Sequence, residues 1–226
     1  MPSRQTPADD HIPVSAVTVA DRIKLQIRRG MLAPGQRLVE ADIMQDTGAS
    51  RGKVREALQR LSTEGLVVIE EFRGASVKRL TRAEVQDIYH LREVLEGLAA
   101  RRLTERAPRA ALRRLEQLQA EMDACEQSGD GERFAELNDR WHQLIIEGAG
   151  NGLAAGFLDR LRTPIFRFQF GMFYSREVMT ISNADHRDIT AAILGGAPDL
   201  AEMAMRRHIR DGHADLSRRA EELFAP

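Results

Sequence analysis

Cysteine is almost absent from this sequence, which contains only Cys125. A single thiol cannot form an internal disulfide, so a disulfide-held scaffold is excluded. No apolar run approaches the roughly 20 residues that cross a bilayer, so no membrane span is expected. Residues 1–16 lack the apolar stretch of a signal peptide, and we interpret them as a flexible polar arm. These absences predict a cytoplasmic protein with no membrane partner.

A net charge of one sign is also missing, because 33 Lys and Arg balance 34 Asp and Glu. This balance weakly disfavours nucleic-acid binding. The cations are unevenly spread, however: the segment from Arg51 to Arg60 holds four cations and one anion. A locally basic element in a neutral chain is typical of a protein with one DNA-binding end. The length of 226 residues suits two modest domains.

The first domain is predicted over residues 17–78 from the order of its periodic segments. Three helical patterns come first, and the third, from Ser50 to Gly65, places its apolar residues on one face. Ser50 is a suitable N-cap for this helix. Two β-branched segments around a turn at residues 70–74 then predict a small hairpin. This order is typical of a winged helix-turn-helix domain, in which the third helix is the recognition helix.

A recognition helix enters the major groove by its N-terminal end, where small, polar or cationic residues are needed. Arg51 and Arg55 lie four residues apart and share a face, from which arginine can bond guanine in bidentate fashion. Lys53 is better placed for phosphate. The alternative is a solvated basic face, since many charge runs are only surface. The candidate DNA-binding residues of this helix are Ser50, Arg51, Gly52, Lys53 and Arg55.

The second domain is predicted over residues 82–226, after a linker at residues 79–81. Thr81 and Glu84 have the spacing of a capping box, which begins the first helix. No strand pattern follows, so the fold class is mainly α, with an antiparallel bundle of about six helices after the winged domain. Helical patterns cover residues 81–106, 109–128, 131–148, 153–170, 183–195 and 198–223, with a break from Gly171 to Ser182.

Histidine is scarce, with six in the sequence, and three of them lie on predicted bundle helices: His142, His186 and His208. Bundle helices can direct such residues at one interior point, where imidazoles bind zinc, nickel or another late transition metal. Their spacing is not a self-contained metal motif, so the pattern alone favours scattered structural histidines. A metal-dependent enzyme built on these histidines is a further alternative. It lacks an HExxH or nucleophile motif and leaves residues 18–78 unexplained.

The first domain also contains a set of matching positions: Gly30, Pro34-Gly35, Leu38, Glu40, Ser50-Arg51, residues 54–58, Leu61, residues 64–67 and Gly74. This set resembles the DNA-binding domain of the GntR family of bacterial regulators. The resemblance implies DNA contact by Arg51 and Arg55, assisted by Ser50 and by the wing around Arg73-Gly74. The family usually has Thr-Pro after Ser-Arg, where this chain has Gly52-Lys53. The operator is therefore expected to differ from the family's common one.

The second domain contains four matching segments: residues 89–96, Trp141-His142 with Gly150-Asn151, residues 185–189 and residues 201–209. They resemble the all-helical effector domain of the FadR-type branch, called FCD. Many members bind a divalent metal through one Asp and three His. The histidines match His142, His186 and His208. The Asp position, four residues before the first histidine, is Asn138 here.

The resemblance implies a homodimer that senses a small carboxylic acid beside a divalent metal, zinc or nickel. Because Asn138 brings no charge, we hypothesise that the metal needs an anionic effector more than a His₃Asp site does. Arg92 could clamp the acid, or it could be a surface ion pair with Glu96; Arg167 is a second candidate clamp. We expect a ligand-responsive repressor of double-stranded operator DNA. A DNA-binding regulator with only a structural metal, or none, remains an alternative.

Overall fold

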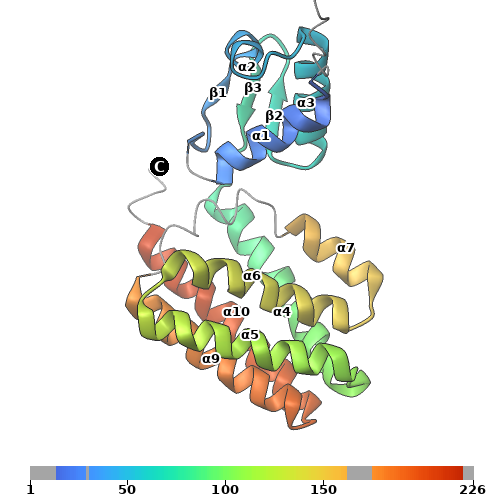
Figure 1. Ribbon diagram of the computed structural model, residues 1–226, viewed down its shortest axis with the longest axis vertical. Coiled ribbons are helices and arrows are strands. Elements are labelled where there is room, and N and C mark those ends of the chain that lie inside the picture. Colours follow the sequence, from blue (N-terminus) through green and yellow to red (C-terminus); the bar gives the residue numbers. More distant parts are fainter. Residues whose placement is uncertain (1–13, 29–30, 162–174, 221–226) are drawn as a thin grey trace, which may run out of the picture. The chain divides into compact units, whose positions relative to one another are not determined.

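The computed structural model describes residues 14–28, 31–161 and 175–220 (Figure 1). It divides into two compact units between Lys78 and Arg79. Three predicted features lie outside the described residues: most of the arm, the end of the 153–170 helix, and Arg167. No helix within the described ranges combines the length and the apolar character needed to span a membrane.

The first unit contains three helices and a small antiparallel sheet. Its elements are α1 (Ala16–Arg28), β1 (Arg37–Leu38), α2 (Glu40–Thr47), α3 (Arg51–Thr63), β2 (Val67–Glu70) and β3 (Gly74–Val77). Strands β2 and β3 form the predicted hairpin. Strand β1 was not predicted from sequence; it pairs with the other edge of β3 and gives the strand order β1-β3-β2. A two-residue strand is too short to show an alternating pattern.

The core of the first unit fixes which side of α3 faces outward. Val54, Ala57, Leu58 and Leu61 of α3 are buried, and α3 packs against α1 and α2. Burying these side chains removes apolar surface from water, which is the main favourable term in folding. The remaining residues of α3, including its basic N-terminal turn, are left on the surface.

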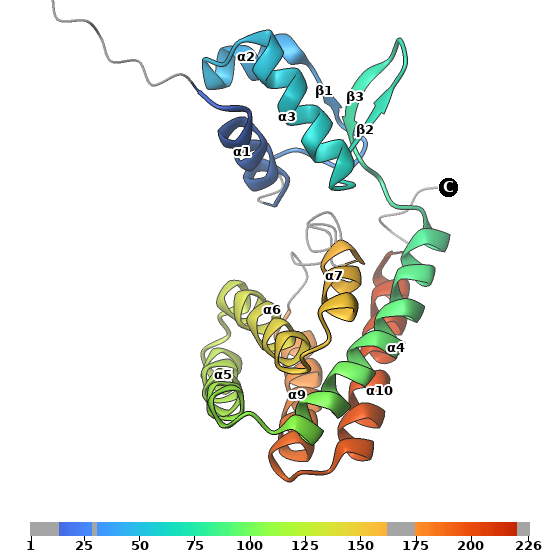
Figure 2. The ribbon, with the colours of Figure 1, turned by 90° about the vertical axis from the view of Figure 1, so that its right-hand side faces the viewer.

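The second unit is entirely helical in its described part, and α4 lies alongside α10 within it (Figure 2). Its elements are α4 (Arg82–Arg106), α5 (Arg109–Ser128), α6 (Gly131–Gly148), α7 (Gly152–Leu161), α9 (Arg176–Leu194) and α10 (Pro198–Ala220). A helix-turn-helix unit with a small sheet, followed by a helical unit, confirms the predicted fold class.

Local capping explains where two of these helices begin. The predicted capping box is present: Glu84 N–H donates to Thr81 Oγ1 at 3.2 Å, and Thr81 N–H donates to Glu84 Oε2 at 2.8 Å. A break between helices was predicted from Gly171 to Ser182. Its second half is wrong, because α9 already begins at Arg176. Ser175 caps it, and the face that carries His186 extends back through the buried Met179.

Candidate functional site

The N-terminal turn of α3 presents the predicted basic residues to solvent. The side chains of Arg51, Lys53 and Arg55 are 66%, 50% and 68% exposed. Gly52 is also exposed, and a Cβ atom at this position would meet no atom within 4 Å. The helix can therefore approach a groove closely at this turn. Contact of these residues with DNA stays a prediction.

Glu40, the first residue of α2, joins the two arginines that were expected to share a face. Arg55 Nε donates to Glu40 Oε1 at 2.8 Å, and Arg51 Nε lies 3.6 Å from Glu40 Oε2. One carboxylate thus aligns both guanidinium groups. This role of Glu40 could not be predicted from sequence, because the distance along the chain from Glu40 to Arg55 follows no helical or strand period.

The N-cap of α3 and the wing contain the other residues that were predicted to assist DNA binding. Ser50 occupies the predicted N-cap position of α3, although its side chain makes no capping hydrogen bond. At the wing, Arg73 is 83% exposed and lies 3.4 Å from Glu70, while Gly74 has a φ of +83°. Phe72, which was not among the predicted wing residues, is 96% exposed and has a φ of +62°.

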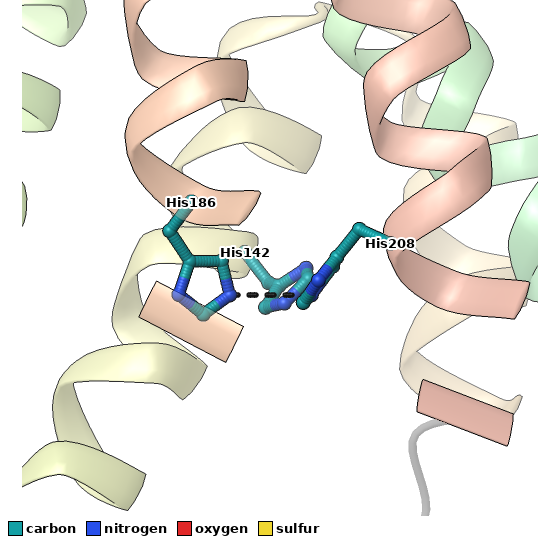
Figure 3. Close-up of side chains that lie close together, drawn as sticks. All are labelled: His142, His186 and His208. Atoms are coloured by element: carbon teal, nitrogen blue, oxygen red, sulfur yellow. Dashed lines mark hydrogen bonds between the residues drawn. The ribbon is translucent and has the colours of Figure 1, made fainter. Parts of the chain in front are cut away.

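Inside the second unit, the three histidines converge from three helices (Figure 3). His142 comes from α6, His186 from α9 and His208 from α10, and all three are buried. Each offers a nitrogen within 4.8 Å of those of the other two. The Nε2 atoms of His186 and His208 are 3.2 Å apart. The pattern-based alternative of scattered histidines is therefore wrong.

Acidic side chains set which nitrogen of two of these rings faces inward. Glu96 Oε2 lies 2.7 Å from Nδ1 of His142, and Asp185 Oδ2 lies 3.3 Å from Nδ1 of His208. A carboxylate at Nδ1 accepts its proton and leaves Nε2 as the ligand atom. Burial, with His208 and His142 adding to it, holds the pKa of His186 well below its ordinary value, so this ring is neutral at pH 7.

The cluster fits a divalent transition metal by two observations. Two nitrogens bound to one ion at zinc-like bond lengths are separated by roughly 2.9–3.4 Å, a range that includes the His186–His208 spacing of 3.2 Å. Asn138 lies one helical turn before His142, and its Oδ1 is buried without a hydrogen-bond partner among the described residues. An oxygen ligand is thus available where the FCD resemblance expects one.

Arg92 forms the predicted i,i+4 ion pair with Glu96, but this pair is not on the surface. Its side chain is 10% exposed and that of Glu96 is 1% exposed, with Arg92 Nε donating to Glu96 Oε1 at 2.8 Å. The guanidinium carbon also lies 5.1 Å from the ring centre of Tyr89. The surface alternative is therefore wrong, because α4 is packed by α6, α7, α9 and α10. The Glu96 carboxylate therefore contacts both Arg92 and His142 of the histidine cluster.

Two family comparisons cover most of the chain. Residues 15–77 match the family described as bacterial regulatory proteins, gntR family. Residues 87–211 match the FCD domain. The boundary between the matches lies near the boundary between the two compact units.

Curated relatives and solved structures agree with these matches. The HTH-type transcriptional repressor RspR of Escherichia coli is 28% identical over 80% of this chain and 79% of its own. A transcriptional regulator of Streptomyces ambofaciens is 32% identical over 86% of this chain and 83% of its own. The E. coli protein McbR/YncC has the same fold, with a TM-score of 0.75 and 19% identity, over 91% of this chain and 99% of that one.

These matches argue against the alternative of a metal-dependent enzyme, because the family and the relatives consist of transcriptional regulators. The exposed basic turn of α3 and the wing are features of its DNA-binding unit. The histidine cluster belongs to the unit that contains the FCD domain. This chain belongs to the GntR family of DNA-binding transcriptional regulators and carries an FCD domain.

Proposed function

We propose that this regulator is a repressor that responds to a small carboxylic acid held, together with a divalent transition metal, inside its helical unit. The observation that carries the proposal is the convergence of three buried histidines from three helices. The Nε2 atoms of His186 and His208 face each other at 3.2 Å, so at most one of them can carry the proton of that contact. A metal ion between the three rings would instead accept the lone pairs of the nitrogens that face one another.

His142, His186 and His208 would hold the metal, with the Oδ1 atom of Asn138 as a fourth ligand. Neutral nitrogens and an amide oxygen suit zinc or nickel. When bound, the metal supplies a positive centre that attracts a carboxylate. The residues of the chain then orient the acid and exclude water from it.

Arg92 is the candidate for binding the second part of the acid. The carboxylate of Glu96 contacts both the buried guanidinium of Arg92 and the ring of His142. An acid of a few atoms could therefore contact both the metal and this arginine. Arg167, the other candidate, remains a prediction outside the described residues. Binding of the acid would favour one arrangement of the bundle helices over another, which is how a ligand changes a regulator.

The names of two relatives support repression, and the two-fold symmetry of many operators supports a homodimer. RspR is named a repressor, and a relative in Paenarthrobacter nicotinovorans is named a probable repressor of a D-xylose utilization operon. We propose a homodimer because two DNA-binding units related by two-fold symmetry would match a two-fold symmetric operator. Fragments of the source genome that the protein retains would identify that operator.

Metal content and acid binding test the pocket directly. We expect protein purified without added metal to contain close to one zinc or nickel ion per chain by elemental analysis. Calorimetry with a panel of small carboxylic acids should give heat with at least one of them, and that acid should change the affinity for the operator. Removing the metal with a chelator should abolish the heat, because the acid loses its main positive partner.

Two outcomes would contradict parts of this proposal. Metal-free protein that still binds the acid would exclude the metal from the effector site. A broad panel that gives neither heat nor a change in operator affinity would exclude the sensor function and favour a regulator with a structural metal or none.

Glu40 is expected to suppress binding to unrelated DNA. Because its carboxylate lies beside Arg51 and Arg55, it repels phosphates near these arginines. In Glu40→Gln, affinity for unrelated duplex should rise by about two- to fivefold, as expected for exposed ion pairs. Affinity for the operator should rise less, because Arg55 is no longer held in one orientation. Competition between operator and scrambled duplex at a fixed salt concentration measures the ratio of the two affinities, which is the discrimination ratio.

The matched control for this change is Glu56→Gln, which breaks the ion pair of Lys53 at 2.9 Å and removes the same charge from the neighbouring helix. If both variants lower the discrimination ratio equally, the effect comes from overall charge and not from alignment of the two arginines.

A further inference from the structure

Glu96 is a fully buried carboxylate in contact with His142, one of the proposed metal ligands. Its residue exposure is 0%, and its two oxygens are divided between Arg92, at 2.8 Å, and His142, at 2.7 Å. Burying a carboxylate is costly unless charge and hydrogen bonds compensate it. A position in the middle of α4 could be filled by an apolar residue at lower cost. The contact with His142 therefore points to a role beyond stability.

The first consequence of this contact concerns the proton on His142. Glu96 Oε1 already accepts a hydrogen bond from Arg92, and Oε2 lies 2.7 Å from Nδ1 of His142, where it accepts the proton of the ring. The lone pair of Nε2 then faces the other two histidines. A neutral side chain at the same place would not enforce this tautomer, since an amide can donate to Nδ1 and leave the proton on Nε2, where it blocks a metal.

The second consequence concerns charge. Three neutral imidazoles and the Asn138 amide give a divalent metal no negative ligand. Glu96 places an anion one hydrogen bond outside the ligands, and this raises the electron donation of His142. Asp185 does the same for His208 over a longer 3.3 Å contact, and its side chain is 21% exposed, so its field is screened more.

We propose that Glu96 is a positioning residue for the metal: it fixes the tautomer of His142 and supplies the negative charge that Asn138 lacks. This inference rests on the proposed metal site. It also revises the expectation from sequence that the metal depends on an anionic effector for its charge. With Glu96 in place, the pocket holds the metal before any acid binds.

The test is the affinity of chelator-stripped protein for zinc and for nickel, measured by competition with a coloured chelator. Glu96→Gln should bind each metal about 10- to 100-fold more weakly, the range found when such outer hydrogen-bond partners are removed. Asp185→Asn should lose less than about tenfold, because its contact is longer and more exposed. Asn138→Asp should strengthen binding more in the Glu96→Gln background than in the wild type, because only that background lacks the compensating charge.

Folding is checked separately, since Glu96→Gln leaves Arg92 buried without a full counter-charge. Circular dichroism and thermal unfolding of the metal-free proteins show whether the fold survives. If it does not, the double change Arg92→Met with Glu96→Gln removes both buried charges, and the same weakening of metal binding is expected from it.

The outcomes separate this inference from the proposed function. If wild-type protein binds neither metal, the metal site itself is wrong. If the wild type binds metal and a folded Glu96→Gln variant binds it equally well, only the role of Glu96 is wrong. An equal gain from Asn138→Asp in both backgrounds overturns the charge compensation.

Discussion

Replacing Arg55 by alanine is expected to abolish sequence-specific DNA binding while leaving the fold intact. An arginine that bonds guanine in bidentate fashion contributes about 1–3 kcal/mol of discrimination, or roughly 5- to 150-fold. In the proposed dimer this loss occurs at both half-sites. The change also leaves the Glu40 carboxylate, now 2.8 Å from Arg55, without its nearer cation and facing DNA. Titration of operator and scrambled duplex should give nearly equal affinities.

Arg60→Ala is the matched control for this experiment. Arg60 is an exposed cation in the last turn of the same helix, so its removal changes the net charge equally but at the end away from the groove. It should weaken binding to both duplexes alike. Specific binding that survives in Arg55→Ala would show that a different face of α3 reads the bases.

Replacing His142 by alanine is expected to abolish metal binding by the helical unit. Loss of an outer partner weakens such sites by about 10- to 100-fold, so loss of a ligand itself should exceed about 100-fold. A metal present at 100 times its dissociation constant stabilises the fold by about 2.7 kcal/mol, which corresponds to roughly 5–10 °C for a unit of this size. Thermal unfolding with and without zinc should show this shift in the wild type and no shift in the variant.

His90→Ala provides the comparison, because His90 is an exposed histidine on α4 that is not part of the cluster. It should keep the full zinc-dependent shift. A shift that persists in His142→Ala would mean that zinc stabilises the protein from a site elsewhere.

The helix starts and the recognition helix could be predicted because their signals are local. The capping box at Thr81 and Glu84 depends on two residues in one turn, and the apolar face of α3 repeats within the helix. The two-residue strand β1 and the early start of α9 could not be predicted in this way. The first is defined by pairing with β3, and the second by the packing of Met179 in the bundle.

The histidine cluster and its neighbours could be predicted only in part, for a similar reason. His142, His186 and His208 come from three helices, so their spacing in sequence says nothing about their distance, and the family resemblance supplied what the pattern could not. The pair Arg92 and Glu96 has the spacing of an ordinary surface ion pair. Its burial depends on helices that meet α4 from several sides, and that is a property of the tertiary fold.

Trp141 places a spectroscopic reporter beside the histidine cluster. It is the only tryptophan of the chain, it is fully buried, and its Nε1 donates to Thr190 at 3.1 Å. Its ring centre lies 4.6 Å from that of His186 and 4.9 Å from that of His142. All tryptophan fluorescence of this protein therefore arises at the wall of the histidine cluster. A paramagnetic ion such as nickel should quench it on binding, so the emission of the unlabelled protein reports the occupancy of the site.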